Sequence, residues 1–129
     1  RLLGSPLGWL PSRAQGARGV ADVASEEEFK QLTTPEGPPS VAFYTAAWCS
    51  PCQEVAAHVD ALSARLEGPH LRVLRVDVDA LAALAKAHGV KAVPHFEVRR
   101  AGHVVERLAG CGPEALAEAM ARHADSYAE

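Results

Sequence analysis

Two cysteines separated by two residues give this sequence its clearest capacity for chemistry. Cys49 and Cys52 stand in the stretch Trp48-Cys49-Ser50-Pro51-Cys52. At this spacing two sulfur atoms can close a small disulfide ring with little movement of the backbone. The pair could therefore take up and release two electrons by thiol–disulfide exchange.

The elements around the pair predict different roles for the two thiols. Residues 40–46 are typical of a buried strand that ends just before Cys49, and Pro51 suits the first turn of a helix. A helix N-terminus presents unpaired N–H groups and a partial positive charge, and both favour thiolate over thiol. We therefore expect Cys49 to be the nucleophile. Cys52, further into the helix and less exposed, is expected to resolve the mixed disulfide.

Zinc binding is the alternative chemistry for a Cys-x-x-Cys pair. A structural zinc site needs four ligands, usually from two such pairs. The chain has three cysteines, so only Cys111 and scattered histidines remain to complete a site. The spacing therefore predicts no metal, and no cofactor beyond a redox-active Cys49–Cys52 disulfide. An odd cysteine count also suits a reducing compartment better than a disulfide-stapled secreted domain.

Hydrophobic periodicity predicts alternating strands and helices over most of the chain. Strands are expected at residues 19–24, 40–46, 71–78, 96–99 and 104–108. Ser25 and Glu28 form a capping box for the first helix, and Asp79 is expected to cap a short third helix. The order β-α-β-α-β-α-β-β-α predicts an α/β fold with a mixed central sheet of four to five strands, flanked by four helices. Its early strands should be parallel, and its last two should form a hairpin.

Residues 46–52 resemble the active-site signature of the thioredoxin family. Further matches follow in the family's order, at residues 76–79, residues 89–94, Gly102 and residues 108–110. The resemblance spans about residues 19–124. It implies the thioredoxin fold and a thiol–disulfide oxidoreductase that acts on protein substrates and is recharged by an upstream reductase.

The same resemblance implies a substrate groove beside the cysteines. Pro94 would be a cis-proline facing the disulfide, where a substrate strand can pair with the backbone. The groove is expected to contain Trp48, Ser50, Pro51, Val93, Pro94 and Gly110. Without the resemblance, Trp48 would read as a core aromatic. Cys111 is either a secondary redox-sensing thiol or a buried packing residue, and packing is the favoured interpretation.

Phe43 is a departure from the family pattern. General reductants of the family carry a buried Asp six residues before the first cysteine, and Phe43 occupies that position here. A buried carboxylate can shuttle the proton of the resolving thiol, which phenylalanine cannot do. Water could still accept that proton, more slowly.

Ser50 replaces the glycine that the family usually carries between the two cysteines. His95 is also unusual, and we expect it to point to the face of its strand away from the thiols, with the other histidines at the surface.

Charge is unevenly spread along the chain. The net charge is −3, but residues 1–21 carry three arginines and no acid. An acidic body argues against nucleic acid as the main partner, and no apolar run is long enough for a membrane span. We expect residues 1–18 to be an extended tail, either the remnant of a transit segment or a partner-binding arm, ahead of one domain at residues 19–129.

The tail also bears on location and partners. An Arg-rich, acid-poor segment is typical of organellar transit sequences, so mitochondrion is the expected location, with chloroplast or cytoplasm as alternatives. A second hypothesis makes the chain an accessory subunit docked in a larger organellar assembly, contacted by residues 1–18. Its role there would be redox-sensing or purely structural.

Overall fold

The computed structural model describes residues 20–65, 71–110 and 112–123 of the 129-residue chain. The predicted tail at residues 1–18 and the predicted secondary thiol Cys111 lie outside the described residues. The elements are β1 (Val20–Asp22), α1 (Glu26–Leu32), β2 (Ser40–Thr45), α2 (Ser50–Arg65), β3 (Arg72–Asp77), α3 (Ala82–Ala87), β4 (His95–Arg100), β5 (His103–Ala109) and α4 (Pro113–His123). Their order is the one that periodicity predicts.

The strands form one five-stranded mixed sheet in the order β1-β3-β2-β4-β5. The pairs β1–β3 and β2–β3 are parallel. Crossover helices make this possible, because α1 connects β1 to β2 and α2 connects β2 to β3. β4 runs antiparallel to both β2 and β5. β2 is therefore the central strand and carries its C-terminal end directly to the cysteines. The predicted parallel early strands and the final hairpin are confirmed.

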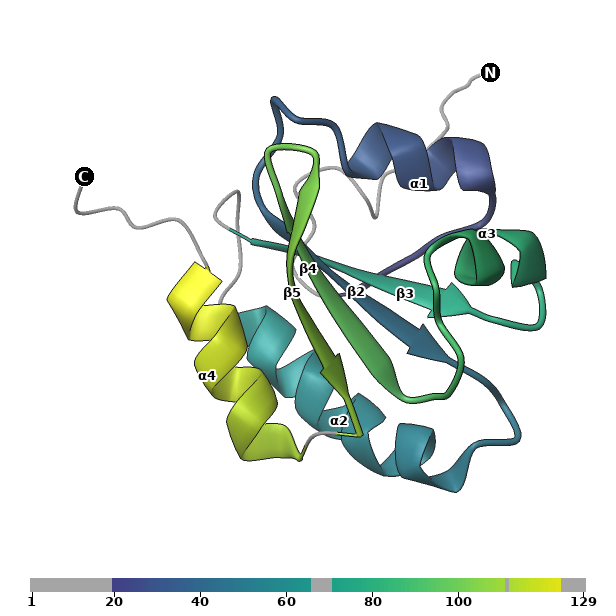
Figure 1. Ribbon diagram of the computed structural model, residues 1–129. Helices are drawn as coiled ribbons and strands as arrows, with labels where there is room; N and C mark the ends of the chain where they lie inside the picture. The colour runs from purple at the N-terminus through teal and green to yellow at the C-terminus, as the bar shows by residue number, and fades with distance from the viewer. Residues whose placement is uncertain (1–19, 66–70, 111, 124–129) are drawn as a thin grey trace, which may run out of the picture.

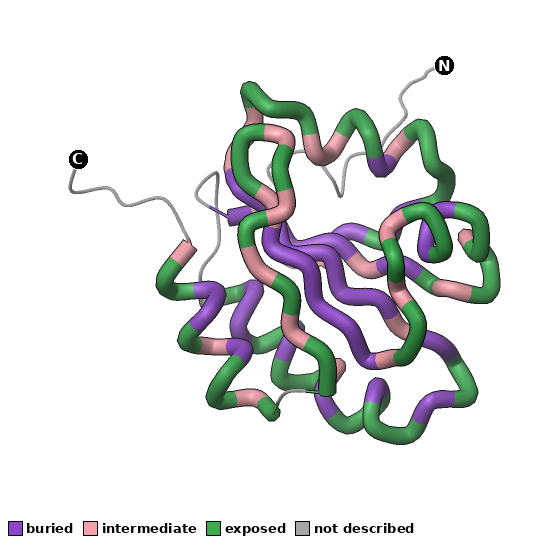
Figure 2. The backbone as a smooth tube through the Cα atoms, viewed as in Figure 1, coloured by how far each residue is buried: buried purple, intermediate pink, exposed green. Residues whose placement is uncertain are grey.

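Helices cover both faces of the sheet (Figure 1). On one face α2 and α4 pack over a core that includes Phe43, Phe96 and both redox cysteines. On the other, α1 and α3 enclose a second core around Tyr44 and Leu74. β2 is buried on both faces, as Figure 2 shows for the middle of the sheet. The site thus lies on a rigid strand and helix rather than on a free loop.

The start of α1 follows the sequence expectation closely. The Ser25 hydroxyl accepts the Glu28 N–H at 3.1 Å, which satisfies one of the free donors of the first turn. Glu28 reaches back to the Ala24 N–H at 2.7 Å, one residue earlier than a standard capping box requires. Phe29 then enters the core on the α1 side of the sheet.

Asp79 does not cap α3, so that prediction was wrong. The residue at the N-cap is Leu81, which makes no side-chain cap hydrogen bond. The turn is instead held by Asp77, whose carboxylate accepts the N–H groups of Asp79 and Ala80 at 2.8 and 3.3 Å. This leaves the Asp79 side chain free to contact the active-site loop.

The β4–β5 hairpin turns through Ala101 and Gly102, both with positive φ (55° and 82°). Two successive residues of this kind match the twist of a tight antiparallel hairpin. The turn lies at the end of the sheet remote from the cysteines and positions β5 beside β4, which follows Pro94.

Candidate functional site

Cys49 and Cys52 form a disulfide at the junction of β2 and α2, with their Cα atoms 5.2 Å apart. Cys49 precedes the helix and is 4% exposed, whereas Cys52 lies inside its first turn and is completely buried. Any partner arriving from solvent therefore reaches the Cys49 sulfur first.

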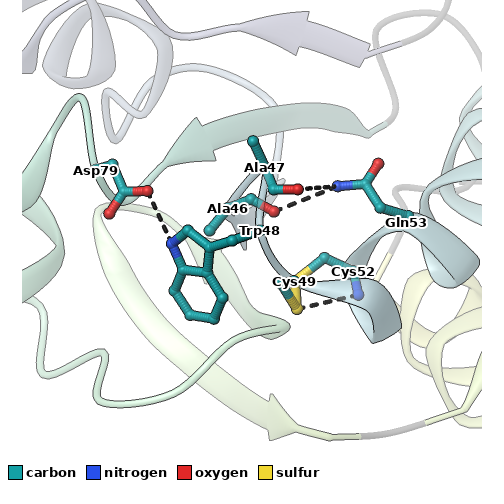
Figure 3. Close-up of a disulfide and its surroundings, with 7 residues drawn as sticks. All are labelled: Ala46, Ala47, Trp48, Cys49, Cys52, Gln53 and Asp79. Carbon is teal, nitrogen blue, oxygen red and sulfur yellow. Dashed lines mark hydrogen bonds between the residues drawn. A yellow bond between two sulfur atoms is a disulfide. The ribbon is translucent and has the colours of Figure 1, made fainter.

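A backbone donor at the start of α2 faces the Cys49 sulfur. The Cys52 N–H donates to the Cys49 sulfur at 3.1 Å (Figure 3). The positive end of the helix macrodipole lies at the same place. Both interactions stabilise a thiolate at Cys49 once the disulfide is reduced, which lowers the barrier to nucleophilic attack.

Hydrogen bonds also hold the loop before Cys49. The Cys49 N–H donates to the Ala46 carbonyl at 3.2 Å. The Gln53 side chain donates to the carbonyls of Ala46 and Ala47 at 3.3 and 3.5 Å, so α2 clamps the loop from the other side (Figure 3). The two cysteines are thus positioned by β2 and α2 together.

Trp48 projects into solvent and is 70% exposed. Its indole N–H donates to the Asp79 carboxylate at 2.9 Å (Figure 3). This bond ties the active-site loop to the turn after β3 and fixes the ring orientation. Trp48 is therefore not a core aromatic; it offers a large apolar contact surface beside the disulfide.

The peptide bond between Val93 and Pro94 is cis. Gly110 adopts a positive φ of 65°, a conformation that glycine accommodates best, and its N–H donates to the Pro94 carbonyl at 3.3 Å. Pro94 and Gly110 meet Pro51 at a cleft of about 290 Å³. Three of the predicted groove residues, from three segments far apart in sequence, therefore line one depression next to the cysteines.

The other predicted groove residues lie outside that cleft. Trp48 and Ser50 are exposed on the active-site loop and the first turn of α2, and Val93 is half-buried against both cores. The remaining cleft residues were not expected from the sequence: Glu54, Val55, His58, Gly112 and Pro113. Glu54 and His58 could have been found from the i, i+4 spacing that places both on one face of α2.

Phe43 is fully buried and stacks on Phe96, with ring centroids 4.9 Å apart and planes inclined by 10°. It belongs to the same core cluster as Cys52. The position that would hold a proton-carrying carboxylate is thus part of an apolar aromatic pair. A second cleft, of about 320 Å³, borders Phe43 and is lined by polar groups that include Thr45 and Gln53.

On the opposite face of β4, Glu97 is a fully buried carboxylate that sequence reasoning missed. It accepts the Tyr44 hydroxyl at 3.1 Å and the Arg99 guanidinium at 2.9 Å, and Arg107 lies 3.3 Å from its second oxygen. His88 hydrogen-bonds to the Tyr44 hydroxyl at 3.0 Å. Burial and the Glu97 charge together raise the pKa of Tyr44.

The histidines divide between the surface and this network. His95 lies on the face of β4 away from the cysteines, as expected, with its ring 5.7 Å from that of Tyr44. His58 and His103 are exposed, but the prediction of a surface role for His88 was wrong, because its imidazole is half-buried against Tyr44. His123 is also half-buried, 2.8 Å from Glu106, and His70 lies outside the described residues.

His95 makes the folded protein sensitive to acid. Its Nε2 is buried without a hydrogen-bond partner among the described residues. Burial, and then the Arg107 charge, hold the pKa of His95 below its ordinary value of 6.5, against the opposing pull of Glu97. The unfolded chain therefore binds this proton more readily than the folded one. The contribution of neutral His95 to the free energy of unfolding is complete above about pH 6.5. It is lost as the pH falls toward the pKa of His95 in the folded state.

Urea unfolding between about pH 7.5 and pH 5 tests this expectation. Replacing His95 with glutamine should flatten the loss of unfolding free energy, which reaches at most about 1.4 kcal/mol per pH unit for one proton. His103→Gln, on exposed β5, is the matched control and should leave the profile unchanged. Identical pH profiles for wild type and His95→Gln would contradict the account.

Within residues 20–65, 71–110 and 112–123, no three His, Cys, Asp or Glu side chains are grouped to hold a metal ion. None of the helices described is both long and apolar enough to cross a membrane.

A disulfide at the mouth of a helix, next to a cis-proline loop and an exposed tryptophan, defines a redox-active dithiol site. The chain belongs to the thioredoxin family, whose family model matches residues 20–122. It is a thiol–disulfide oxidoreductase, and members of this family act on protein disulfides.

Individual relatives agree with this assignment. The chain is similar to an H-type thioredoxin from Chlamydomonas reinhardtii, with 39% identity over 69% of this chain and 78% of that protein. The structure resembles thioredoxin NaTrxh from Nicotiana alata with a TM-score of 0.77 and 25% identity, covering 89% of this chain and 100% of the other. Oxidized thioredoxin O1 from Arabidopsis thaliana matches with a TM-score of 0.73 and 28% identity, over 83% and 99% of the two chains. The alternative of a docked accessory subunit finds no support in these relatives.

Proposed function

We propose that this protein reduces disulfides in protein substrates, with Cys49 as the attacking thiol and Cys52 as the resolving thiol. The observation that carries the proposal is the Cys49–Cys52 disulfide at the start of α2, with Cys49 the outer of the two sulfurs. The ordering follows from access and from the donor that faces Cys49.

The exchange proceeds in two displacements. The Cys49 thiolate attacks one sulfur of the substrate disulfide, and the other substrate sulfur leaves as a thiolate that takes up a proton. The Cys52 thiol then loses its proton and attacks the Cys49 sulfur, which releases the second substrate thiol. The substrate gains two electrons and two protons, and the protein is left with its disulfide.

Loss of the Cys52 proton has to proceed without a carboxylate at position 43. We propose that water in the cleft beside Phe43 accepts it, since that cleft is large enough for solvent and carries polar walls at Thr45 and Gln53. The Phe43–Phe96 pair itself has no group that could accept the proton. This arrangement supports resolution of the mixed disulfide at a slower rate than a general base would allow.

The substrate is proposed to lie as an extended strand beside Pro94, which lines the cleft together with Pro51. Pro51, Pro94 and Gly110 give this strand an apolar bed, and Trp48 flanks it with its exposed ring. Ser50 stands on the solvent side of the first helical turn, where it alters the surroundings of the thiolate and hence the reduction potential.

Insulin reduction tests the proposed function. In the presence of a small dithiol as electron source, catalytic amounts of the purified protein should accelerate precipitation of the insulin B chain over the dithiol alone. A rate equal to that of the dithiol alone, with the Cys49–Cys52 pair confirmed as reduced, would reject the proposed activity.

A dedicated reductase is proposed to return two electrons to the disulfide after each turnover, because the reaction stops at the oxidised protein otherwise. We also propose a mitochondrial location, supported by the three arginines and the absence of acids in residues 1–21. Fractionation of the source cells, with chloroplast and cytoplasmic markers alongside, decides between the three compartments.

A further inference from the structure

The cleft beside the disulfide combines a mostly apolar lining with an acidic side chain. Pro51, Val55, Pro94 and Pro113 supply most of its apolar lining. Glu54, from the first turns of α2, is the acidic side chain that lines it, and it is exposed to solvent. A carboxylate at the edge of an apolar depression acts through a lower local dielectric than one on an open surface.

A second carboxylate lies close to Gly112, one of the residues that line the cleft. Gly112 lines the cleft, and the Glu114 Oε1 atom lies 3.7 Å from the point where a Cβ on Gly112 would stand. Glu114 belongs to the first turn of α4, whereas Glu54 belongs to α2, so the two acids approach from different helices. Among the residues that the structure describes, no lysine or arginine lines the cleft to neutralise them.

We infer that this cleft selects disulfide substrates with a lysine or arginine next to the reactive cysteine. The inference rests on the proposed function and deepens it by naming the substrate class. A substrate segment that places its cysteine at Cys49 passes beside Pro51 and Pro94, and a basic residue next in the segment faces the two carboxylates. Charges arranged in this way raise the association rate and disfavour acidic competitors.

His58 is the other titratable group that lines the cleft, four residues after Glu54 on α2. A protonated imidazole there would oppose the carboxylates. The experiment is therefore run at one fixed pH, so that this imidazole is in the same state for every peptide.

The test compares disulfide-linked peptides that differ at one position, adjacent to the cysteine, which is arginine, glutamine or glutamate. The pre-reduced protein should reduce the arginine peptide about tenfold faster than the glutamate peptide in kcat/KM at low ionic strength. Raising the salt to about 1 M should reduce this ratio to near one.

Variants locate the source of the preference. Glu54→Gln with Glu114→Gln should lower the arginine-to-glutamate ratio to about twofold. Glu36→Gln removes one carboxylate from an exposed turn at the other end of β2 and should keep the wild-type ratio. Equal rates for the three peptides, or a preference that survives the double substitution, would overturn the inference while leaving the proposed function intact. Failure to reduce any peptide would overturn both.

Discussion

Replacing Cys49 with serine is expected to lower disulfide-reductase activity by at least about a thousandfold. The reason is chemical, since a serine hydroxyl does not ionise near neutral pH and cannot attack a disulfide sulfur. The N–H of Cys52 and the helix terminus would still face position 49, but they would have no thiolate to stabilise. Insulin reduction with a small dithiol as electron source provides the measurement.

Cys111→Ser is the matched control for this loss, because it makes the same chemical change at the chain's third cysteine. It should retain most of the wild-type rate. Substantial activity in Cys49→Ser, or an equal loss in Cys111→Ser, would show that the reactive thiol is not the one at the mouth of α2.

Truncating Glu97 to alanine is expected to destabilise the fold by about 3–5 kcal/mol. The side chain is completely buried, and its carboxylate is the common partner of Tyr44, Arg99 and Arg107. Its removal would strand the Arg99 guanidinium, which is largely buried, without its anion. Breaking a buried pair from one side costs far more than the net stabilisation that the intact pair provides, because the remaining charge stays desolvated.

Glu106→Ala removes a carboxylate from the neighbouring strand and serves as the control. Glu106 pairs with the half-exposed Arg122 and with His123, and the Arg122 hydrogen bond holds the pKa of Glu106 below its ordinary value. The decrease in the free energy of unfolding caused by Glu106→Ala is expected to be well below that caused by Glu97→Ala, as for other solvent-accessible pairs. Urea unfolding measures the free energy of unfolding of both variants.

If Glu97→Ala does not fold, Glu97→Gln replaces it. The free energy of unfolding should then fall by about 1–3 kcal/mol, because the amide keeps some of the hydrogen bonds. A Glu97 variant no less stable than Glu106→Ala would contradict the account.

The sequence was informative where chemistry and local geometry coincide. The spacing of Cys49 and Cys52 predicts a redox-active pair, and Ser25 with Glu28 predicts the start of α1. Apolar periodicity predicted the nine elements of the described residues and their order, because each element buries a face of characteristic period. The cis bond before Pro94 followed from the family resemblance and not from any property of the dipeptide itself.

Features that depend on sheet register escaped prediction. Glu97 reads in sequence as a surface residue of an alternating strand, but β4 pairs with β2 and β5 so that tyrosine and arginine side chains converge on it. Asp79 was expected to cap α3, but Asp77 holds that turn and the Asp79 carboxylate accepts the Trp48 indole N–H instead. Gly112 reaches the cleft only because α4 packs beside α2, which no local pattern encodes.

Trapping the reaction halfway tests the central claim most directly. In Cys52→Ser the outer thiol can still attack a substrate disulfide, but the thiol proposed to release the product is absent. Incubation of this variant with insulin, followed by mass spectrometry of the digested adduct, should give a mixed disulfide between Cys49 and an insulin cysteine that a reductant dissolves. An adduct at Cys111, or no adduct while Cys49 is demonstrably reduced, would contradict the assignment of Cys49 as the nucleophile of a dithiol oxidoreductase.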